Sequence, residues 1–303
     1  MQGRYGYVLS EPAVILGKGR QCLVKLATST RYQTPRKVAI KINLPSRSSA
    51  RESEILFQLN HENVVEIFDY FVFQDHSYIV LALAENGDMR NFVRQRGRLG
   101  EALALKMCEQ IFEGVAYLHD TASVAHCDLK CENVLVDERE DVKIADFGLA
   151  VEIAVGSNGT SQPRRTSNSR NHGDSQNGVS DSCSSRAESI SPIPQGIASL
   201  GGSPAYAAPE VLDSRVTDLR AADVWSAGVI TFFILTTYLP FGCYGNKNIR
   251  EAMNRPLRWP RPLKQVKKSD RTFVQSALVL GPSERPTARA LLERLQRMQP
   301  STT

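Results

Sequence analysis

The stretch VAHCDLKCENVLVD, which runs from Val124 to Asp137, places acidic, basic, amide, imidazole and thiol side chains between two apolar runs. No other part of the chain is as dense in reactive groups. Within it, Asp128 can accept a proton from an attacking hydroxyl or orient it, Lys130 can neutralise a phosphoryl group in transfer, and Asn133 can hold a divalent metal on its amide oxygen. This combination is typical of the centre of an active site.

A second candidate metal ligand follows in ADFGLA, where Asp146 stands thirteen positions after Asn133. Asn133 directly precedes the apolar run VLV, and Asp146 follows the run VKI. Because both runs have the length and composition of short strands, we expect the two side chains to lie at neighbouring strand ends and to converge.

Upstream, the run VAIK places Lys41 at the end of an apolar strand. A lysine there either extends its charge to solvent or needs a carboxylate or anion to offset burial. In RESEILFQLN, helical spacing puts Glu52, and not Glu54, on the face that carries Ile55 and Leu56. We therefore expect Lys41 and Glu52 to pair.

The segment GKGRQCLV carries Gly17 and Gly19, whose backbone can approach a polyphosphate closely and donate N–H groups to it. Such a pair also occurs in ordinary hairpin turns. Cys22 stands where a third glycine is usual, which limits how closely that part of the loop can pack on phosphate.

Composition narrows the class of protein. The chain has 303 residues, 42% of them apolar, and a net charge of +5 whose lysines and arginines are spread along it, which favours a solvated surface over nucleic-acid binding. Its six cysteines form no C-x-x-C pair, which argues against disulfides and zinc.

The first residues lack an apolar signal region, and Gln2 stands where myristoylation needs glycine. We expect a cytoplasmic, or nuclear, protein without a membrane partner, and we expect the run Val224–Leu239 to be a buried helix.

The periodicity predicts two parts. Short apolar strands fill the region from Ala13 to Ala84, interrupted by one helix over Arg51–Asn60, and helical periodicity dominates from Leu99 onward. Between Ser157 and Ser191, 11 of 35 residues are serine, so this insert is expected to be disordered. The fold class is therefore α+β, with a small β-rich lobe and a larger helical lobe.

These motifs together resemble the eukaryotic protein kinase family. The resemblance rests on G-x-G-x-x-x-x-V at 17–24, VAIK at 38–41, HCDLKCEN at 126–133, DFG at 146–148 and APE at 208–210. Lys130 and the run GSPAYAAPE look like the serine/threonine type, closest to the testis-specific and AMPK-related side of the calmodulin-kinase group. The resemblance implies a two-lobed kinase fold, with an ATP-binding lobe at 1–84 and a catalytic and substrate-binding lobe at 85–303. It also implies ATP and Mg²⁺ as cofactors.

Carried over residue by residue, the resemblance assigns three sets of roles. It implies catalytic roles for Lys41, Glu52, Asp128, Lys130 and Ser203, metal binding by Asn133 and Asp146, and nucleotide contacts from Gly17, Lys18, Gly19, Val24, Ala39, Lys41, Leu81, Leu83, Asp88 and Leu135. Leu81 would be the gatekeeper and 82–84 the hinge that binds adenine.

The resemblance also implies a structural framework. It places Leu56, Ile67, His126 and Phe147 in a stacked apolar spine anchored by Asp223. It further predicts a buried ion pair between Glu210 and Arg285 in the larger lobe.

One departure concerns regulation. Cys127 replaces the arginine that grips a phosphorylated activation loop in most of the family, and a neutral thiol cannot make that bidentate contact. By alignment, Ser199 is where such a phosphate would stand. We therefore expect activity that does not depend on phosphorylation of Ser199. Cys127 and Cys131 flank Asp128 and are either reactive thiols or buried, inert ones.

The insert contains RRTS and RAES, at 164–167 and 186–189, which look like substrates of kinases that prefer arginine before the acceptor, although a serine-rich segment also produces such motifs by chance. Asp88 and Glu132 could supply acidic subsites for such arginines. A third position, acidic in relatives with this preference, is Phe233 here. Arginine preference is thus a weak hypothesis, as is autophosphorylation of Ser167 or Ser189.

The expected function is transfer of the γ-phosphoryl group of ATP to serine or threonine hydroxyls of protein substrates by a monomer. One rival is a pseudokinase scaffold that binds partners without chemistry, which Cys22 and Cys127 favour and the complete set of catalytic side chains opposes. The other is a kinase of small molecules, which the segment GSPAYAAPE opposes.

Overall fold

The computed structural model describes residues 5–19, 22–31, 35–44, 46–154, 162–163, 204–216, 218–242, 249–260 and 266–298. Apart from Gln162–Pro163, the serine-rich insert lies outside the described residues, as do Ser199 and Ser203. Gln162–Pro163 form a two-residue strand, β11, which pairs antiparallel with β10 (Val151–Ala154).

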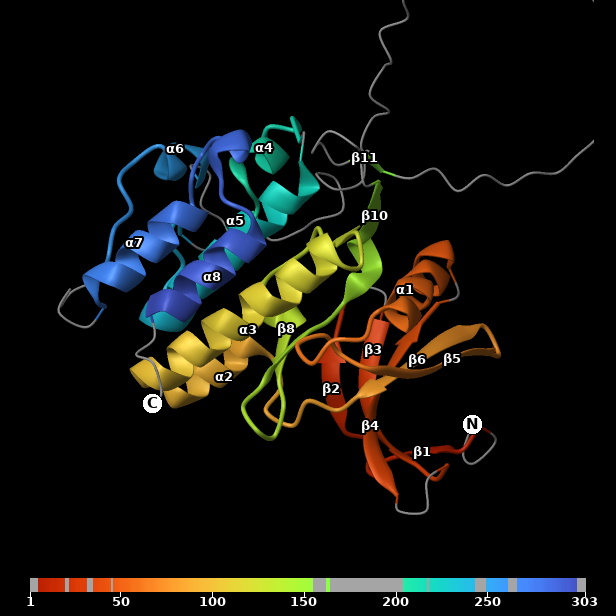
Figure 1. The fold of residues 1–303 in the computed structure, drawn as a ribbon. Helices are drawn as coiled ribbons and strands as arrows, with labels where there is room; N and C mark the ends of the chain where they lie inside the picture. Colours follow the sequence, from red (N-terminus) through yellow and green to blue (C-terminus); the bar gives the residue numbers. More distant parts are fainter. Residues whose placement is uncertain are drawn as a thin grey trace, which may run out of the picture.

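A six-stranded antiparallel sheet forms the smaller lobe (Figure 1). Its order is β1-β3-β4-β6-β5, and β2 pairs with β3 beside this path. The sequence predicts five of these strands and misses the short first one. The strands are β1 (Tyr7–Leu9), β2 (Ile15–Lys18), β3 (Cys22–Ser29), β4 (Arg36–Asn43), β5 (Ile67–Phe73) and β6 (His76–Ala82).

Alternation along the central strand β4 decides which way Lys41 points. Val38 and Ile40 belong to an apolar cluster on one face of the sheet, and Ala39 belongs to the main core on the other face. Because side chains alternate between faces, Lys41 shares the face of Ala39. The strand therefore directs a lysine toward the interior between the two lobes.

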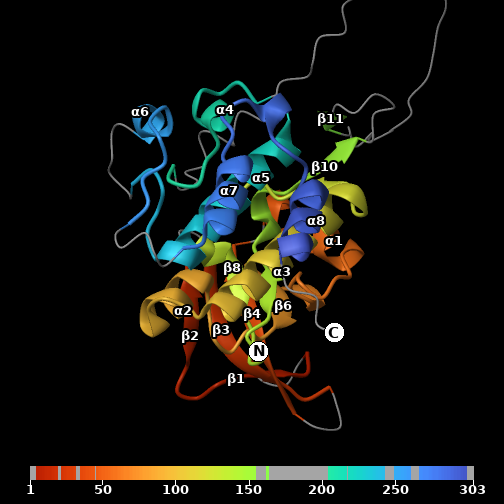
Figure 2. The same cartoon turned by 60° about the vertical axis from the view of Figure 1, so that its left-hand side comes forward.

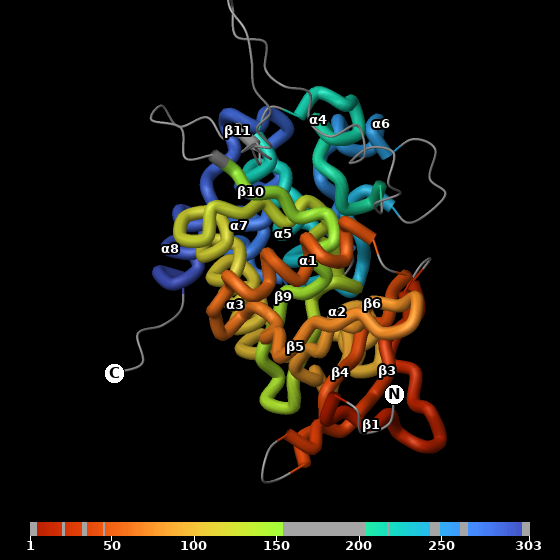
Figure 3. Tube along the Cα trace, turned by 90° about the vertical axis from the view of Figure 1, so that its right-hand side faces the viewer, coloured from red at the N-terminus to blue at the C-terminus, as the bar shows by residue number. Residues whose placement is uncertain are grey.

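Helix α1 (Arg47–Gln58) lies between this sheet and the helical lobe (Figure 3). It begins four residues before the expected start, because a capping box stabilises the first turn. The Ser46 hydroxyl accepts from the Ser49 N–H at 3.2 Å, and the Ser49 hydroxyl accepts from the Ser46 N–H at 3.2 Å. The inward face carries Glu52, Ile55 and Leu56, all buried, as the spacing predicts.

The larger lobe is helical. Its helices are α2 (Met89–Arg96), α3 (Glu101–Asp120), α4 (Pro209–Leu212), α5 (Leu219–Thr236), α6 (Ile249–Met253), α7 (Lys268–Ala277) and α8 (Ala288–Met298). Short strands β7 (Val124–Ala125), β8 (Val134–Val136) and β9 (Val142–Ile144) and the 3-10 turns η1 (Cys131–Asn133), η2 (Phe147–Leu149) and η4 (Pro282–Glu284) complete it. This two-lobed α+β architecture confirms the expected fold class.

Helix α5 is the core of the helical lobe and packs against α3 and α7 (Figure 2). It covers most of the apolar run Val224–Leu239, which the sequence predicts to be a buried helix. Its length and composition would suffice to cross a membrane, but 89% of that window is buried inside the protein. The apolar run is thus explained by packing within the lobe.

A buried ion pair joins α4 to the residue that follows η4. Arg285 Nη1 lies 2.7 Å from Glu210 Oε1, and Nη2 lies 3.2 Å from Oε2. Arg285 also donates to the carbonyl oxygens of Val279 and Ala221. This confirms the expected Glu210–Arg285 pair.

We predict that Arg285→Ala lowers the free energy of unfolding by about 3–5 kcal/mol, because it leaves the Glu210 carboxylate buried without its partner. Urea unfolding measures this. The matched control is Arg289→Ala, which breaks an exposed pair with Asp120 (3.3 Å) and should cost less than about 1 kcal/mol. Equal losses in the two variants would contradict the structural role of the buried pair.

Candidate active site

The strand register brings the expected nucleotide-binding residues together. Gly17 lies opposite Val24, and Val24 lies opposite Lys41. Ala39 lies opposite Leu81 on β6. From the other lobe, Leu135 forms a bridge with Asp88 and packs, like Val24 and Leu83, against the core that contains Ala39 and Leu81. Strand pairing therefore places Gly17, Val24, Ala39, Lys41 and Leu81 on adjacent strands, and Leu135 of the other lobe packs against the same continuous core.

The glycine turn between β2 and β3 is closed by the Gly19 N–H, which donates to the carbonyl oxygen of Cys22 at 2.9 Å. A Cβ atom at Gly19 would lie 2.6 Å from Cys22 Sγ, so a side chain there would collide with the thiol. Gly17 opposes Val24 without such crowding. The cysteine therefore occupies space beside Gly19, as expected for a side chain at the place of a third glycine.

Lys41 joins two carboxylates from different parts of the chain. Its Nζ lies 2.7 and 2.9 Å from the two oxygens of Glu52 on α1, and 2.7 Å from Asp146 Oδ1. The Lys41 and Glu52 side chains are 12% and 4% exposed, whereas Asp146 is 45% exposed. The predicted Lys41–Glu52 pair is confirmed, and Asp146 completes a network that spans both lobes.

Burial disfavours the charged forms of Lys41 and Asp146, but the attraction between them outweighs it. The carboxylates of Glu52 and Asp146 hold the pKa of Lys41 above its ordinary value. The Lys41 ammonium holds the pKa of Asp146 below its ordinary value. At neutral pH the Lys41 ammonium is therefore charged and lies beside the Asp146 carboxylate, of which only Oδ1 contacts the lysine.

The segment that carries Asp146 is fixed next to the segment that carries Asn133. Strands β8 and β9 pair with Val134 opposite Ile144, and the Ala145 N–H donates to the Asn133 carbonyl oxygen at 2.8 Å. Asp146 itself has φ 64° and ψ 71°, the left-handed region that aspartate tolerates better than most residues. The two metal-ligand candidates therefore lie at neighbouring strand ends, as expected, and their binding of a metal stays a prediction.

Asp128 lies at the centre of the dense stretch. The Lys130 ammonium contacts Asp128 Oδ2 at 2.5 Å, and the Asn133 side-chain amide donates to the same oxygen at 3.0 Å and to the Asp128 carbonyl oxygen at 2.8 Å. One carboxylate oxygen is thus held by two donors, which fixes its direction. Among the described residues, no hydrogen bond engages the other oxygen, Oδ1.

Asp223 of α5 anchors the stretch Val124–Asp137, here named the catalytic segment. Its carboxylate accepts from the backbone N–H groups of His126 (2.7 Å) and Cys127 (2.9 Å), and it lies 3.0 Å from the ring of His119. His126 in turn contacts the Ala145 carbonyl oxygen, and its ring lies 4.8 Å from that of Phe147 between centroids, tilted by 53°. The buried Asp223 carboxylate therefore links α5 to the catalytic segment and, through His126, to the segment that carries Asp146.

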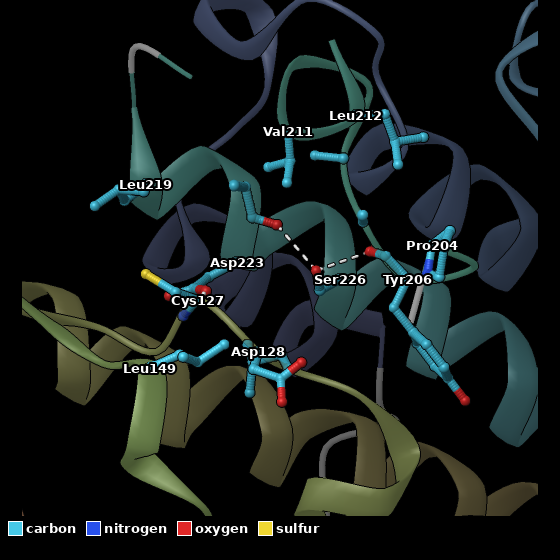
Figure 4. Close-up of a pocket in the computed structure, with 14 residues that line it drawn as sticks. Cys127, Asp128, Leu149, Pro204, Tyr206, Val211, Leu212, Leu219, Asp223 and Ser226 are labelled. Carbon is cyan, nitrogen blue, oxygen red and sulfur yellow. Dashed lines mark hydrogen bonds between the residues drawn. The ribbon is translucent and has the colours of Figure 1, made fainter. Parts of the chain in front are cut away.

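A cavity of about 140 Å³ lies between the catalytic segment and helices α4 and α5 (Figure 4). Cys127 is on its wall, together with Leu149, Val211 and Leu219. Figure 4 shows the Cys127 and Asp128 side chains pointing in different directions. In the part of the chain that the structure describes, none of the 14 lining residues is a lysine or arginine.

The two cysteines beside Asp128 lie in environments that keep a thiol neutral. Cys131 is fully buried, and burial raises its pKa. Burial likewise raises the pKa of the Cys127 thiol, and the carboxylates of Asp223 and Asp128 raise it further. Because the thiolate is the nucleophile, these geometries favour the inert alternative for both.

Several contacts at the site are not predicted from the sequence. Ser48 at the start of α1 donates to the Gly148 carbonyl oxygen at 3.3 Å, beside the Lys41 network. Arg90 on α2 pairs with Glu132 of the catalytic segment. The one sequence signal for Arg90 was its place two residues after Asp88, and the helix that carries it was not expected. Ser203, a predicted catalytic residue, lies outside the described residues.

The described residues are suited to a metal ion that takes most of its ligands from a bound substrate and from water. They contain no group of three or more His, Cys, Asp and Glu side chains placed to hold an ion. Mg²⁺ is commonly held by one or two protein oxygen ligands together with substrate phosphates and water. Asp146 and Asn133 would fit that pattern, because no hydrogen bond within the described residues engages Asp146 Oδ2 or Asn133 Oδ1.

Comparison with known proteins gives two matches. A family model described as "Protein kinase domain" matches residues 11–170 and 178–295. The chain is also 31% identical over 245 residues to testis-specific serine/threonine-protein kinase 2 of Mus musculus. That alignment covers 78% of this chain and 58% of the mouse protein, so the chain spans little more than half the length of this relative.

Proposed function

The chain belongs to the protein kinase family, and we propose that it transfers the γ-phosphoryl group of ATP to serine or threonine hydroxyls of protein substrates. The observation that carries the proposal is the convergence of two networks between the lobes. One joins Lys41 to Glu52 and Asp146, and the other joins Asp128 to Lys130 and Asn133. A scaffold that only binds partners has no need of either network.

Different residues would position the nucleotide, the metal ion and the acceptor hydroxyl. Lys41, held in its charged form, would contact the α- and β-phosphates, and the apolar residues Val24, Ala39 and Leu135 would enclose the base. When bound by Asn133 and Asp146, Mg²⁺ would neutralise phosphate charge. Asp128 would orient the acceptor hydroxyl and take its proton.

Lys130 would serve the developing charge on the transferred group. It is 21% exposed and lies against Asp128, so its ammonium is next to the place where the acceptor oxygen must stand. Electrostatic stabilisation by such a pre-positioned cation requires no rearrangement during transfer. Ser203, expected to contact Asp128 and Lys130, remains a proposal from the sequence.

We further propose that activity does not depend on phosphorylation of Ser199. The cavity beside Cys127 supports this, because its described walls are mostly apolar and offer no lysine or arginine to pair with a phosphate. A neutral thiol cannot supply that charge. A monomeric state and a cytoplasmic or nuclear location are proposals that rest on the composition alone.

We predict that Asp128→Asn lowers the rate of phosphate transfer to a serine peptide library at least a hundredfold, because the acceptor hydroxyl loses its base. Transfer from labelled ATP measures this. Asp213→Asn, at an exposed pair with Arg250 (3.2 Å), is the matched control and should retain the wild-type rate. Absence of transfer by the wild-type chain would contradict the proposed activity and favour the scaffold.

For Ser199, we predict that substitution by alanine changes the transfer rate by less than about tenfold, or ~1.4 kcal/mol of barrier. The physical reason is that no lysine or arginine lines the described cavity beside Cys127, the residue that replaces the family's phosphate-binding arginine. The same peptide assay, run on protein treated with phosphatase, measures it. A larger loss would show that another cation does the work of the missing arginine.

A further inference from the structure

Glu132 is the carboxylate that lies nearest in sequence to Asp128 on the catalytic segment. It stands four positions after Asp128, between Lys130 and Asn133, and its side chain is 33% exposed. An acceptor peptide must bring its hydroxyl to Asp128, and each extended residue adds roughly 3.3 Å. Side chains a few positions from the acceptor therefore come within reach of Glu132.

Arg90 already occupies this carboxylate. Its Nη1 lies 2.6 Å from Glu132 Oε1, and the Arg90 side chain is 26% exposed. The other oxygen, Oε2, is buried and has no hydrogen-bond partner among the described residues. A bidentate arginine pair needs both carboxylate oxygens, so an incoming guanidinium finds one oxygen taken and the other covered.

The other two positions considered from the sequence are engaged or apolar. Asp88 caps α2: Oδ1 accepts from the Asn91 N–H at 2.9 Å, and Oδ2 accepts from the Asn91 side-chain amide at 2.7 Å. The third position is Phe233, which is 6% exposed and part of the core. Of the three positions, Phe233 is apolar, the Asp88 carboxylate is engaged as the cap of α2, and the Glu132 carboxylate is neutralised by Arg90.

Helix stability does not account for an arginine at position 90. Arg90 lies in the first turn of α2, where the helix dipole disfavours a cation. Arg94 and Arg96 on the same helix lie in the last turn, where a cation is favoured. The first-turn arginine is therefore better explained by its contact with Glu132.

We propose that Arg90 is a specificity-determining residue, which fills the acidic subsite beside the acceptor and makes the site discriminate against peptides that carry arginine there. The inference rests on the proposed function and refines its substrate class. Preferred acceptors are serine or threonine peptides with an uncharged or acidic residue at that position. The RRTS and RAES motifs of the insert are then poor substrates for the chain itself.

The experiment uses the full chain and peptides with one serine acceptor, in which arginine or alanine is placed at each position around it. For the wild type, no position should favour arginine by more than about threefold. Arg90→Met keeps the apolar stem and releases Glu132, so at one position the ratio of kcat/KM for arginine over alanine should rise about tenfold or more. Arg94→Met, an exposed arginine on the same helix, is the matched control and should not change the ratio.

The double variant Arg90→Met/Glu132→Gln separates specificity from a general effect on folding. It should lose the arginine preference that Arg90→Met gains, because the ratio of arginine to alanine peptide is insensitive to a loss of folded protein that affects both peptides alike. A wild type that already favours arginine tenfold, or an Arg90→Met variant whose ratio stays unchanged, overturns the inference. If no transfer occurs, peptide affinity measured by fluorescence anisotropy on the same variants tests the same arginine preference, and absence of transfer by itself counts against the proposed function alone.

Discussion

A buried lysine between two carboxylates is the interaction on which the arrangement of this protein depends. Lys41 comes from the sheet, Glu52 from α1 and Asp146 from the turn that follows β9. Neither Lys41 nor Glu52 could be buried alone without a large desolvation cost, whereas together, with the half-exposed Asp146 beside them, the charges offset one another. The position of α1 and the position of Asp146 are thereby coupled through one ammonium group.

Buried carboxylates that are compensated by nearby donors also occur deeper in the helical lobe. Asp223 is 2% exposed and is compensated by two backbone N–H groups and the ring of His119. Glu210 is compensated by Arg285. In each case a buried acid binds a loop to a helix, so the segments that carry the reactive groups are fixed by polar contacts within an apolar core. Rigid support of this kind is what positioning chemistry requires.

Sequence reasoning succeeded where a pattern had one physical solution. Glu52 could be chosen over Glu54 because only one of them shares the helix face of Ile55 and Leu56. Strands were found where β-branched residues recur, and α5 was found because its apolar run is long. The placement of Asn133 and Asp146 at neighbouring strand ends followed from the two short strands beside them.

Other features could not be found in this way. The start of α1 depends on a reciprocal contact between two serines, and α2 is short and carries many arginines, so neither gives a clear apolar period. The Arg90–Glu132 pair joins residues 42 positions apart and leaves no periodic signal. It engages one oxygen of Glu132, a side chain that the sequence alone presents as an open carboxylate.

The affinity of the chain for ATP, with and without magnesium, tests the central claim most directly. If Lys41 and Asp146 face one nucleotide, a fluorescent ATP analogue should bind the wild type more tightly with magnesium present, and Lys41→Met should weaken that binding about tenfold or more. Lys143→Met, whose ammonium contacts the Glu62 carbonyl oxygen instead, should bind as the wild type does. Equal binding by both variants, or no binding by the wild type, would contradict the claim that these side chains meet around a nucleotide.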